Sequence, residues 1–472
     1  MSKIDWQNVL GPIHADFTER ELIELEKAIG EYSDRAVRVH PSIANSDLPF
    51  ETEPIPWFDR GRWLIDNKCR PGAFLKYAAG DYYIQDAGSM LALALCDVQP
   101  GQWVCDTCAA PGGKSSGLLE ELRGTGLVLS NEVIRSRLEL LELTLARVGH
   151  SNYVVVNSEV EELAEMCSDV FDCVIVDAPC TGQSMVARGK QSLAAFSDKQ
   201  IEHSAARQQR ILRAAAELVK PGGRLVYSTC TFAVAENEAM IDSFRSEHTD
   251  WLPVTDPKLS AWASPSHEGC YRLWPHRDRC AGAFAAALVR PENSLATTSA
   301  LPTNSVHSTR TRFHGKASSQ FTRVDLGAQD IPWLTSADNQ PLRLWQRGSE
   351  LHYFSNSVPA EWLESRARVV VAGVPIAEQR GGEWQPSYAA SVAAFPEFYA
   401  TAEFEITDSQ AIEYLSGATV RLPPQLKEPP MAWSKLVWRG RQLAWSKYTG
   451  SRESGGVLKN HLPKALRKQN LT

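Results

Sequence analysis

The stretch Phe171-Asp-Cys-Val-Ile-Val-Asp-Ala-Pro-Cys-Thr-Gly182 predicts the fold of the middle of this chain. Its apolar half is typical of a buried strand that ends shortly before Cys180. A helical stretch over residues 200–219 and a second short strand then lead into Tyr227-Ser-Thr-Cys-Thr231. A strand, a crossover helix and a strand form a parallel pair whose carboxyl ends share one edge of the sheet. We therefore expect Cys180 and Cys230 at the same ligand-binding edge, where two thiols suggest covalent chemistry.

The same alternation of strands and helices extends over residues 81–291. Strands are predicted at 103–105, 127–130, 153–156, 173–176 and 224–227, and helices at 114–122, 135–148, 200–219 and 235–247. Alternation at this spacing favours an α/β fold with a doubly wound parallel sheet.

The flanking regions differ in composition from this central part. Residues 1–80 contain an amphipathic helix near 18–32, which Thr18 should cap, followed by short strands and turns, so they form an α+β extension. Residues 292–330 are rich in Ser and Thr without a usable period and are predicted to be a linker. Residues 331–400 and 401–472 contain short Trp-rich apolar segments with Gly and Pro breaks, which suggest a largely β second half.

The overall composition is that of a soluble globular protein. The chain has 472 residues, of which 43% are hydrophobic and 22% charged, and this length suits about three domains with cores of their own. No apolar run reaches the roughly 18 to 20 residues of a membrane span, and the first residues lack the pattern of a secretion signal. We expect a cytoplasmic protein with no membrane contact, whose ten cysteines are mostly reduced.

Charge is distributed unevenly along the chain. The net charge is −7, yet from Lys427 to Thr472 ten Lys and Arg stand against two acidic residues. Trp and Tyr side chains alternate with these cations, at Trp433, Trp438, Trp445 and Tyr448. This mixture favours an ordered module with a base-stacking and phosphate-binding face over a solvated tail.

A glycine loop joins the first strand to its helix, in Cys105-Asp-Thr-Cys-Ala-Ala-Pro-Gly-Gly-Lys-Ser115. Its two glycines let the backbone approach a ligand closely, and the start of the helix presents free N–H groups. A Walker phosphate loop is excluded because its first glycine would fall at Cys108. No second cysteine pair stands at zinc-ligand spacing, so we expect no metal. The loop therefore favours a small nucleoside-like cofactor.

Three acidic residues follow predicted strands at this edge. Glu132 comes about twenty residues after the glycines, where an acid can bind ribose hydroxyls, although a surface acid is the alternative. Glu159 stands in a similar place after the third strand and gives a weaker signal. Asp177 closes an apolar strand near Cys180, which favours a place at the active edge over a role as a helix or turn cap.

Free cysteines in proteins are most often small buried hydrophobes, and this interpretation suits Cys96, Cys167 and Cys173. Cys180 and Cys230 differ, because each follows a strand end where a thiol can face a cleft.

Three of these motifs together carry a family resemblance. Asp-Thr-Cys-Ala-Ala-Pro-Gly-Gly-Lys (106–114), Asp-Ala-Pro-Cys-Thr-Gly (177–182) and Tyr-Ser-Thr-Cys-Thr (227–231), in this order, resemble the RNA cytosine-C5 methyltransferases of the RsmB/NOP/NSUN type, which use S-adenosylmethionine. Beyond the catalytic part, Leu342-Arg-Leu-Trp-Gln-Arg347, Ala402-Glu-Phe-Glu-Ile-Thr-Asp408 and Leu458-Lys-Asn-His-Leu-Pro463 resemble the bacterial RsmF branch. That branch modifies 16S ribosomal RNA and ends in a PUA-like RNA-binding module.

The resemblance implies a role for each candidate residue. It implies a class I methyltransferase domain with a Rossmann-like sheet, in which Cys230 is the nucleophile, Cys180 assists product release and Asp177 contacts the cytosine. The cofactor would be cradled by Cys108, Ala109, Ala110, Pro111, Gly112, Gly113 and Lys114, with Glu132 on its ribose and Glu159 beside its adenine. Asp177 would also belong to the residues that bind the cofactor. Two positions depart from the family pattern. Glu159 stands where Asp is usual, and Val186-Ala-Arg-Gly-Lys190 replaces a common Arg-Lys pair.

The implied function is methyl transfer from S-adenosyl-L-methionine to C5 of a cytosine in 16S ribosomal RNA, through a covalent cysteine–C6 adduct. The expected partner is ribosomal RNA or the small ribosomal subunit, contacted by residues 1–80 and 401–472, and the protein is expected to be a monomer. The same reaction on tRNA remains an alternative, as does a non-catalytic RNA-binding assembly factor. Intact Cys180, Cys230, Asp177 and the two loop glycines argue against the latter.

Overall fold

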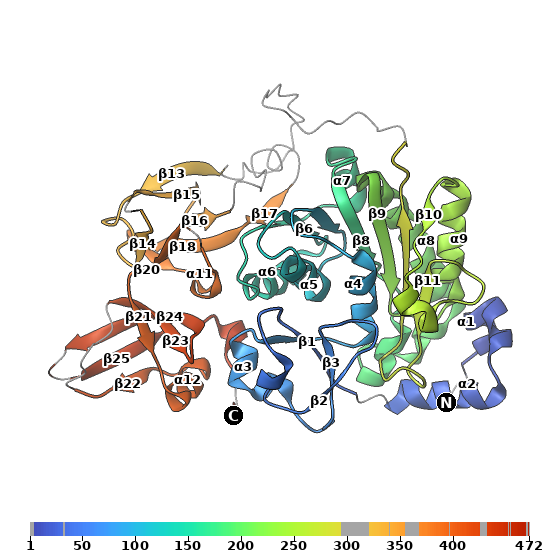
Figure 1. Ribbon diagram of the computed structural model, residues 1–472, viewed down its shortest axis with the longest axis horizontal. Helices are drawn as coiled ribbons and strands as arrows, with labels where there is room; N and C mark the ends of the chain where they lie inside the picture. The colour runs from blue at the N-terminus through green and yellow to red at the C-terminus, as the bar shows by residue number, and fades with distance from the viewer. Residues whose placement is uncertain are drawn as a thin grey trace.

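The computed structural model describes residues 4–31, 34–293, 321–338, 340–354, 368–395, 397–424, 432–451, 453, 455–468 and 471. Figure 1 shows a central α/β domain with the N-terminal elements beneath it and two strand-rich C-terminal domains to one side. Within the described ranges, no helix combines the length and the apolar character of a membrane span.

The central sheet contains nine strands in the order β10-β12-β9-β8-β5-β6-β7-β17, with β11 paired to β12. Its parallel strands are β5 (Trp103–Asp106), β6 (Leu127–Asn131), β7 (Tyr153–Val156), β8 (Phe171–Asp177) and β9 (Val219–Thr229). The chain runs from β5 through β6 to β7 and then returns to place β8 and β9 on the other side of β5. The strand order therefore reverses between β5 and β8, which is where open α/β sheets bind ligands.

Helices cover both faces of this sheet (Figure 1). One face carries α4 (Leu91–Cys96), α5 (Gly113–Glu121) and α6 (Leu138–Ala146), and the other carries α7 (Val160–Met166), α8 (Asp198–Leu218) and α9 (Glu238–Glu247). Along β8, Cys173 and Ile175 belong to the first core, whereas Val174 and Val176 belong to the second. Burial on both sides explains why this strand is an unbroken apolar run.

The predicted strands and helices of this domain are all present, with ends shifted by a few residues. The sheet is mixed rather than wholly parallel, because β10 (Leu252–Pro253), β11 (Cys270–Leu273) and β12 (Ala283–Val289) extend it beyond β9 in antiparallel pairing. The sequence of β12 contains four alanines, which have low strand propensity. Its pairing with β9 on one side and with β10 and β11 on the other makes it a strand.

The N-terminal extension is α+β, as expected. It contains α1 (Trp6–Leu10), α2 (Glu19–Glu31), α3 (Leu75–Ala78) and a sheet in the order β2-β3-β1-β4, with β1 (Ala36–Val39), β2 (Thr52–Pro54), β3 (Gly61–Leu64) and β4 (Tyr82–Ile84). Thr18 caps α2: its hydroxyl accepts a hydrogen bond from the Glu21 N–H at 3.2 Å, and the Glu21 carboxylate accepts one from the Thr18 N–H at 3.0 Å.

The third region is a β-rich domain. Its larger sheet has the order β13-β15-β16-β18-β19, with β13 (Thr322–Leu326), β15 (Leu342–Arg347), β16 (Glu350–Tyr353), β18 (Val374–Arg380) and β19 (Glu383–Pro386); β14 (Leu334–Ser336) pairs with β20 (Phe398–Ala400), and α11 spans Tyr388–Val392. β17 (Val369–Ala372) leaves this domain to pair with β7 of the central sheet.

The stretch 292–330, expected to be an irregular linker, contains a strand near its end, over residues 322–326. β13 has a mostly polar sequence and is a strand because it pairs with β15 over five residue pairs. Residues 294–320 of that stretch lie outside the described residues.

The last domain has the strand order β21-β23-β24-β25-β22, with β21 (Glu403–Glu405), β22 (Val420–Leu422), β23 (Trp433–Trp438), β24 (Arg441–Ser451), β25 (Gly455–Asn460) and helix α12 (Asp408–Leu415). Its core also includes Leu75 of α3, so this domain packs against the N-terminal extension.

The tryptophans of the last domain do not form the predicted stacking face. Trp433, Trp438 and Trp445 are buried, and Trp445 packs edge-on against Trp333 of the preceding domain, with ring centroids 5.1 Å apart. Strand pairing turns these large apolar rings inward, where their area stabilises the fold. The prediction of an ordered module is confirmed, but its aromatic residues build the core and the contact between domains.

Candidate active site

The two predicted thiols meet at the carboxyl ends of neighbouring strands. Cys180 follows β8 and Cys230 follows β9, and their sulfur atoms lie 3.4 Å apart. The Cys230 N–H also points at the Cys180 sulfur, 3.4 Å away. Parallel pairing of the two strands, with Asp177 opposite Ser228, brings both loops to one place. The expectation that both thiols reach one edge of the sheet agrees with this geometry.

The contact makes the two thiols chemically unequal. The hydrogen bond from Cys180 lowers the pKa of the Cys230 thiol, and the charge of Lys114 acts in the same direction. The same hydrogen bond, together with burial, raises the pKa of Cys180 well above its ordinary value. Because the thiolate is the nucleophilic form of cysteine, Cys230 is the better nucleophile of the pair.

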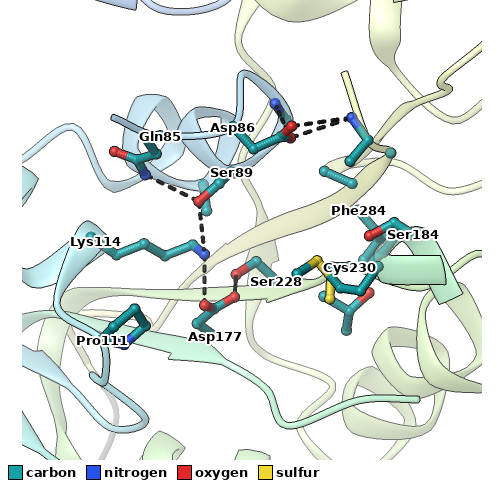
Figure 2. Close-up of a pocket in the computed structure, with 18 of the residues that line it drawn as sticks. Gln85, Asp86, Ser89, Pro111, Lys114, Asp177, Ser184, Ser228, Cys230 and Phe284 are labelled. Carbon is teal, nitrogen blue, oxygen red and sulfur yellow. Dashed lines mark hydrogen bonds and ion pairs between the residues drawn. The ribbon is translucent and has the colours of Figure 1, made fainter. Parts of the chain in front are cut away.

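A chain of polar contacts runs beside Cys230, as Figure 2 shows. The Lys114 ammonium lies 2.7 Å from the Asp177 carboxylate, which also accepts a hydrogen bond from the Ser228 hydroxyl at 2.9 Å. Lys114 donates to the Ser89 hydroxyl at 3.3 Å, and Gln85 donates to the same hydroxyl at 3.0 Å. Burial alone would lower the pKa of Lys114, but Asp177, Asp106 and Cys230 together outweigh it and the pKa is raised. The ammonium therefore stays charged next to the thiols.

These groups line a cavity of about 370 Å³. Its floor contains Asp177, Ser228 and Cys230, and its other walls come from four further segments: Tyr83 to Ala92, the glycine loop, Ser184 to Lys190, and Ala281 to Phe284. The volume is larger than one pyrimidine ring needs and falls within the usual range of ligand sites.

The glycine loop is held tightly against its surroundings. Gly112 has a φ of +102°, and a Cβ at this position would lie 2.9 Å from the side chain of Thr144. Asp106, fully buried at the end of β5, accepts a hydrogen bond from the Ser115 hydroxyl at 2.6 Å. Burial raises the pKa of Asp106 to about 6 and that of Cys108 to about 12. The Cys108 thiol therefore stays protonated within the loop.

The remaining cofactor candidates occupy different positions. Ala109, Pro111, Gly113 and Lys114 border the cavity, whereas Cys108, Ala110 and Gly112 do not. Glu132 is buried at the end of β6, where its carboxylate accepts a hydrogen bond from the Ile134 N–H at 2.8 Å and contacts Arg137 at 3.1 Å. Glu159 is exposed at the start of α7. Neither acid borders the cavity, and both lie along the same sheet edge as the glycine loop.

This arrangement suits an elongated nucleoside cofactor. A carboxylate has about four lone-pair positions, so Glu132 can still accept hydrogen bonds from a pair of ribose hydroxyls. A ligand held there, with its other end over the glycine loop, would point into the cavity towards Cys230.

Several residues of the site were not predicted from the sequence. Gln85, Asp86 and Ser89 come from the segment after β4, and Phe284 comes from β12. Asp86 pairs with Arg188 at 2.6 Å, and this contact joins the N-terminal wall to the loop whose sequence departs from the family pattern. None of these residues stands in a local motif that would have predicted it. Asp106 is different, because its place at a strand end directly before the glycine loop is a signal that the sequence does contain.

Comparison with known proteins places this geometry in a family. The model of the 16S rRNA methyltransferase RsmB/F family matches residues 92–289, and the model of the RsmF PUA domain matches residues 401–468. The ribosomal RNA small subunit methyltransferase F proteins of Shigella boydii and Escherichia coli K12 are each 30% identical over 426 residues, which span 88% of this chain and 84% of theirs. The chain belongs to the RsmB/F methyltransferase family.

The match to the RsmB/F family model contains the glycine loop, Asp177 and both thiols. Solved structures agree at the level of the fold. A methyltransferase homologue from Pyrococcus horikoshii is 28% identical, with a TM-score of 0.52 over 61% of this chain and 98% of that one. NSun6 from the same organism, crystallised with SFG, has a TM-score of 0.52 over 60% of this chain and 98% of that one; at 17% identity it shows the fold alone.

Proposed function

We propose that this protein transfers a methyl group from S-adenosyl-L-methionine to C5 of a cytosine in 16S ribosomal RNA, through a covalent adduct between Cys230 and C6. The observation that carries the proposal is the pair of thiols 3.4 Å apart, of which Cys230 lines the cavity with a lowered pKa and Cys180 lies behind it with a raised pKa. A reaction that needs only binding and positioning would not need two thiols in contact.

The chemistry of cytosine explains the need for a nucleophile. C5 of the ring is a poor nucleophile towards a methyl group. When the Cys230 thiolate forms a bond to C6, electron density moves to C5, which can then attack. When bound, the cofactor would supply the methyl group and leave as S-adenosylhomocysteine, and the protein's part is to hold both reactants together.

Asp177 and Lys114 would face the ring. The carboxylate can accept a hydrogen bond from the exocyclic amino group of cytosine. The Lys114 ammonium lies beside it and would stabilise negative charge that develops on the ring when sulfur adds to C6. In this role Lys114 would act on the base as well as on the cofactor.

Product release needs the C5 proton to leave and the S–C6 bond to break. Removal of that proton restores the C5–C6 double bond and expels Cys230 as a thiolate. Cys180 touches Cys230 and can give its proton to the departing thiolate, and the proton that a base at the cavity took from C5 then restores the Cys180 thiol. This sequence gives the two thiols separate tasks.

RNA binding is assigned to the flanking domains. The PUA match at residues 401–468 and the docking of this domain on the N-terminal extension support a continuous RNA surface over residues 1–80 and 401–472. The small subunit as target rests on the names of the relatives. A target nucleotide inside folded RNA has to be flipped out or locally exposed to reach the cavity.

Incubation with methyl-labelled S-adenosylmethionine tests the proposal. Small ribosomal subunits, protein-free 16S RNA and tRNA from cells that lack this gene would serve as substrates, and digestion to nucleosides followed by mass spectrometry would identify the product. We expect labelled 5-methylcytidine in 16S RNA or the subunit. Label in tRNA alone, or in a different nucleoside, would overturn the proposal.

A further inference from the structure

A buried carboxylate behind the cavity joins the loops that carry the two thiols. Glu236 ends the 3-10 turn η8 (Val234–Glu236) and is fully buried. Its Oε1 accepts a hydrogen bond from the Thr181 hydroxyl at 2.6 Å, and its Oε2 accepts one from the Thr181 N–H at 3.0 Å. Thr181 directly follows Cys180, so the loop of the first thiol is held at two points.

The same carboxylate holds the loop of the second thiol. The hydroxyl of Thr231, directly after Cys230, donates to Glu236 Oε1 at 3.3 Å and lies 2.8 Å from the Thr181 hydroxyl. Gln208 of α8 donates to Oε2 at 2.8 Å. These four donors match the lone-pair positions of one carboxylate, which accepts only and donates nothing.

A neighbouring acid shows what a purely structural role looks like in this segment. Glu238, two residues further on, is equally buried, and its carboxylate binds the guanidinium of Arg272 on β11. That ion pair fixes α9 to the sheet edge. Glu236 instead binds both segments whose separation sets the distance between the thiols.

We propose that Glu236 is a positioning residue that keeps Cys180 and Cys230 in hydrogen-bond contact. The proposal rests on the thiol chemistry of the proposed function. The contact distinguishes the nucleophile from its partner, so loss of the positioning carboxylate would make the two thiols more alike. Other groups that act on Cys230 are Asp177, Lys114 and Ser184, which remain in place in the test below.

The test replaces the carboxylate with an amide of the same shape. In Glu236→Gln, the amide NH2 group replaces one oxygen and faces groups that donated hydrogen bonds to the carboxylate. Two donors cannot pair with each other, so the loops should move apart. Alkylation of Cys230 by iodoacetamide, followed by peptide mass spectrometry across a pH series, reports its thiolate fraction without RNA or cofactor. We expect the midpoint to rise by about one pH unit and the rate at pH 7 to fall up to about tenfold. An unchanged midpoint in folded protein would overturn the proposal.

Two further variants separate positioning from general loosening. Glu238→Gln is the matched control, which should lower the melting temperature and keep the wild-type midpoint for Cys230; an equal shift in both variants would overturn the proposal. Thr181→Val keeps the backbone hydrogen bond and serves if Glu236→Gln does not fold. Thr181→Val should raise the midpoint for Cys230 alkylation by less than Glu236→Gln does. No shift in this variant would contradict the proposed role of Glu236. Because this readout needs no methyl transfer, its outcome is independent of the nucleoside assay.

Discussion

The guanidinium of Arg38 on β1 binds the carboxylate of Glu120 on α5 through two hydrogen bonds of 2.9 Å, and both groups are buried. Further N–H groups of Arg38 reach the hydroxyl of Ser116 at 2.8 Å and the carbonyl of Gly113 at 2.6 Å. The N-terminal extension therefore supports the glycine loop directly, through one side chain that is saturated with acceptors. The loop and the extension form one structural unit.

Arg38→Met should lower the free energy of unfolding by about 3–5 kcal/mol, because it leaves the Glu120 charge buried with part of its compensation removed. Urea denaturation followed by tryptophan fluorescence measures this loss. Arg20→Met is the control, since the Arg20–Glu24 pair on α2 is exposed and contributes little. A loss no larger than that of the control would contradict the assignment.

Cys180→Ala should trap the reaction at the covalent stage. Cys230 can still add to C6, but its partner for release is gone, so a protein–RNA adduct should persist on a denaturing gel when labelled RNA and S-adenosylmethionine are present. Cys230→Ala should give neither adduct nor 5-methylcytidine. Normal turnover by Cys180→Ala would show that the division of labour between the thiols is wrong.

Asp106 should make stability depend on pH in acid. Its folded pKa is about 6 because of burial, against an ordinary value of 3.8, so between these values the folded protein keeps a proton that the unfolded chain has lost. Stability due to this group therefore falls as pH rises from about 4 to about 6 and is constant above. Asp106→Asn removes this titration. The unfolding free energy of the variant relative to that of the wild type should therefore rise by up to about 3 kcal/mol between pH 4 and pH 6. Urea titrations at pH 4, 5, 6 and 7 measure it, and a constant difference would contradict the assignment.

Lys447 and Lys459 face each other directly across β24 and β25. Like charges in this position destabilise a sheet; the Glu383 carboxylate, 3.8 Å from Lys447, offsets part of this repulsion, and an RNA phosphate would offset more of it. Replacing both with Gln should weaken RNA binding and reduce the slope of log affinity against log salt by about one or two. Filter binding at several salt concentrations measures this. Lys258→Gln, on an exposed 3-10 turn of the catalytic domain, is the control and should leave the slope unchanged.

The central sheet could be predicted because its signals are local. An apolar run such as Val174 to Val176 buries both faces, and the residues that follow it have to lie at the carboxyl edge. The meeting of Cys180 and Cys230 follows from that topology alone. The supporting groups could not be predicted in this way, since Gln85, Phe284 and Arg38 reach the site from distant segments.

The last domain shows a different limit. Composition indicated cations between aromatic residues but could not tell which face of a strand would be buried. Trp433 and Trp445 lie inside because β23 and β24 pair and pack against the preceding domain. The same packing means that a deletion from residue 427 would remove β23, β24 and β25 and expose Leu75, so point substitutions are the better test of RNA binding.

The pairing of β17 with β7 affects how the protein is made. Val369–Ala372 leave the ribosome long after the rest of the central sheet, and until then the outer edge of β7 presents unpaired backbone groups. Such an edge is a template for pairing with another chain. In a nascent chain, or in a recombinant fragment that ends after the catalytic domain, β7 is therefore an exposed edge strand that can pair with other chains until β17 covers it. Expression of the catalytic domain by itself should give aggregates, and its boundaries for biochemical work should extend through residue 400.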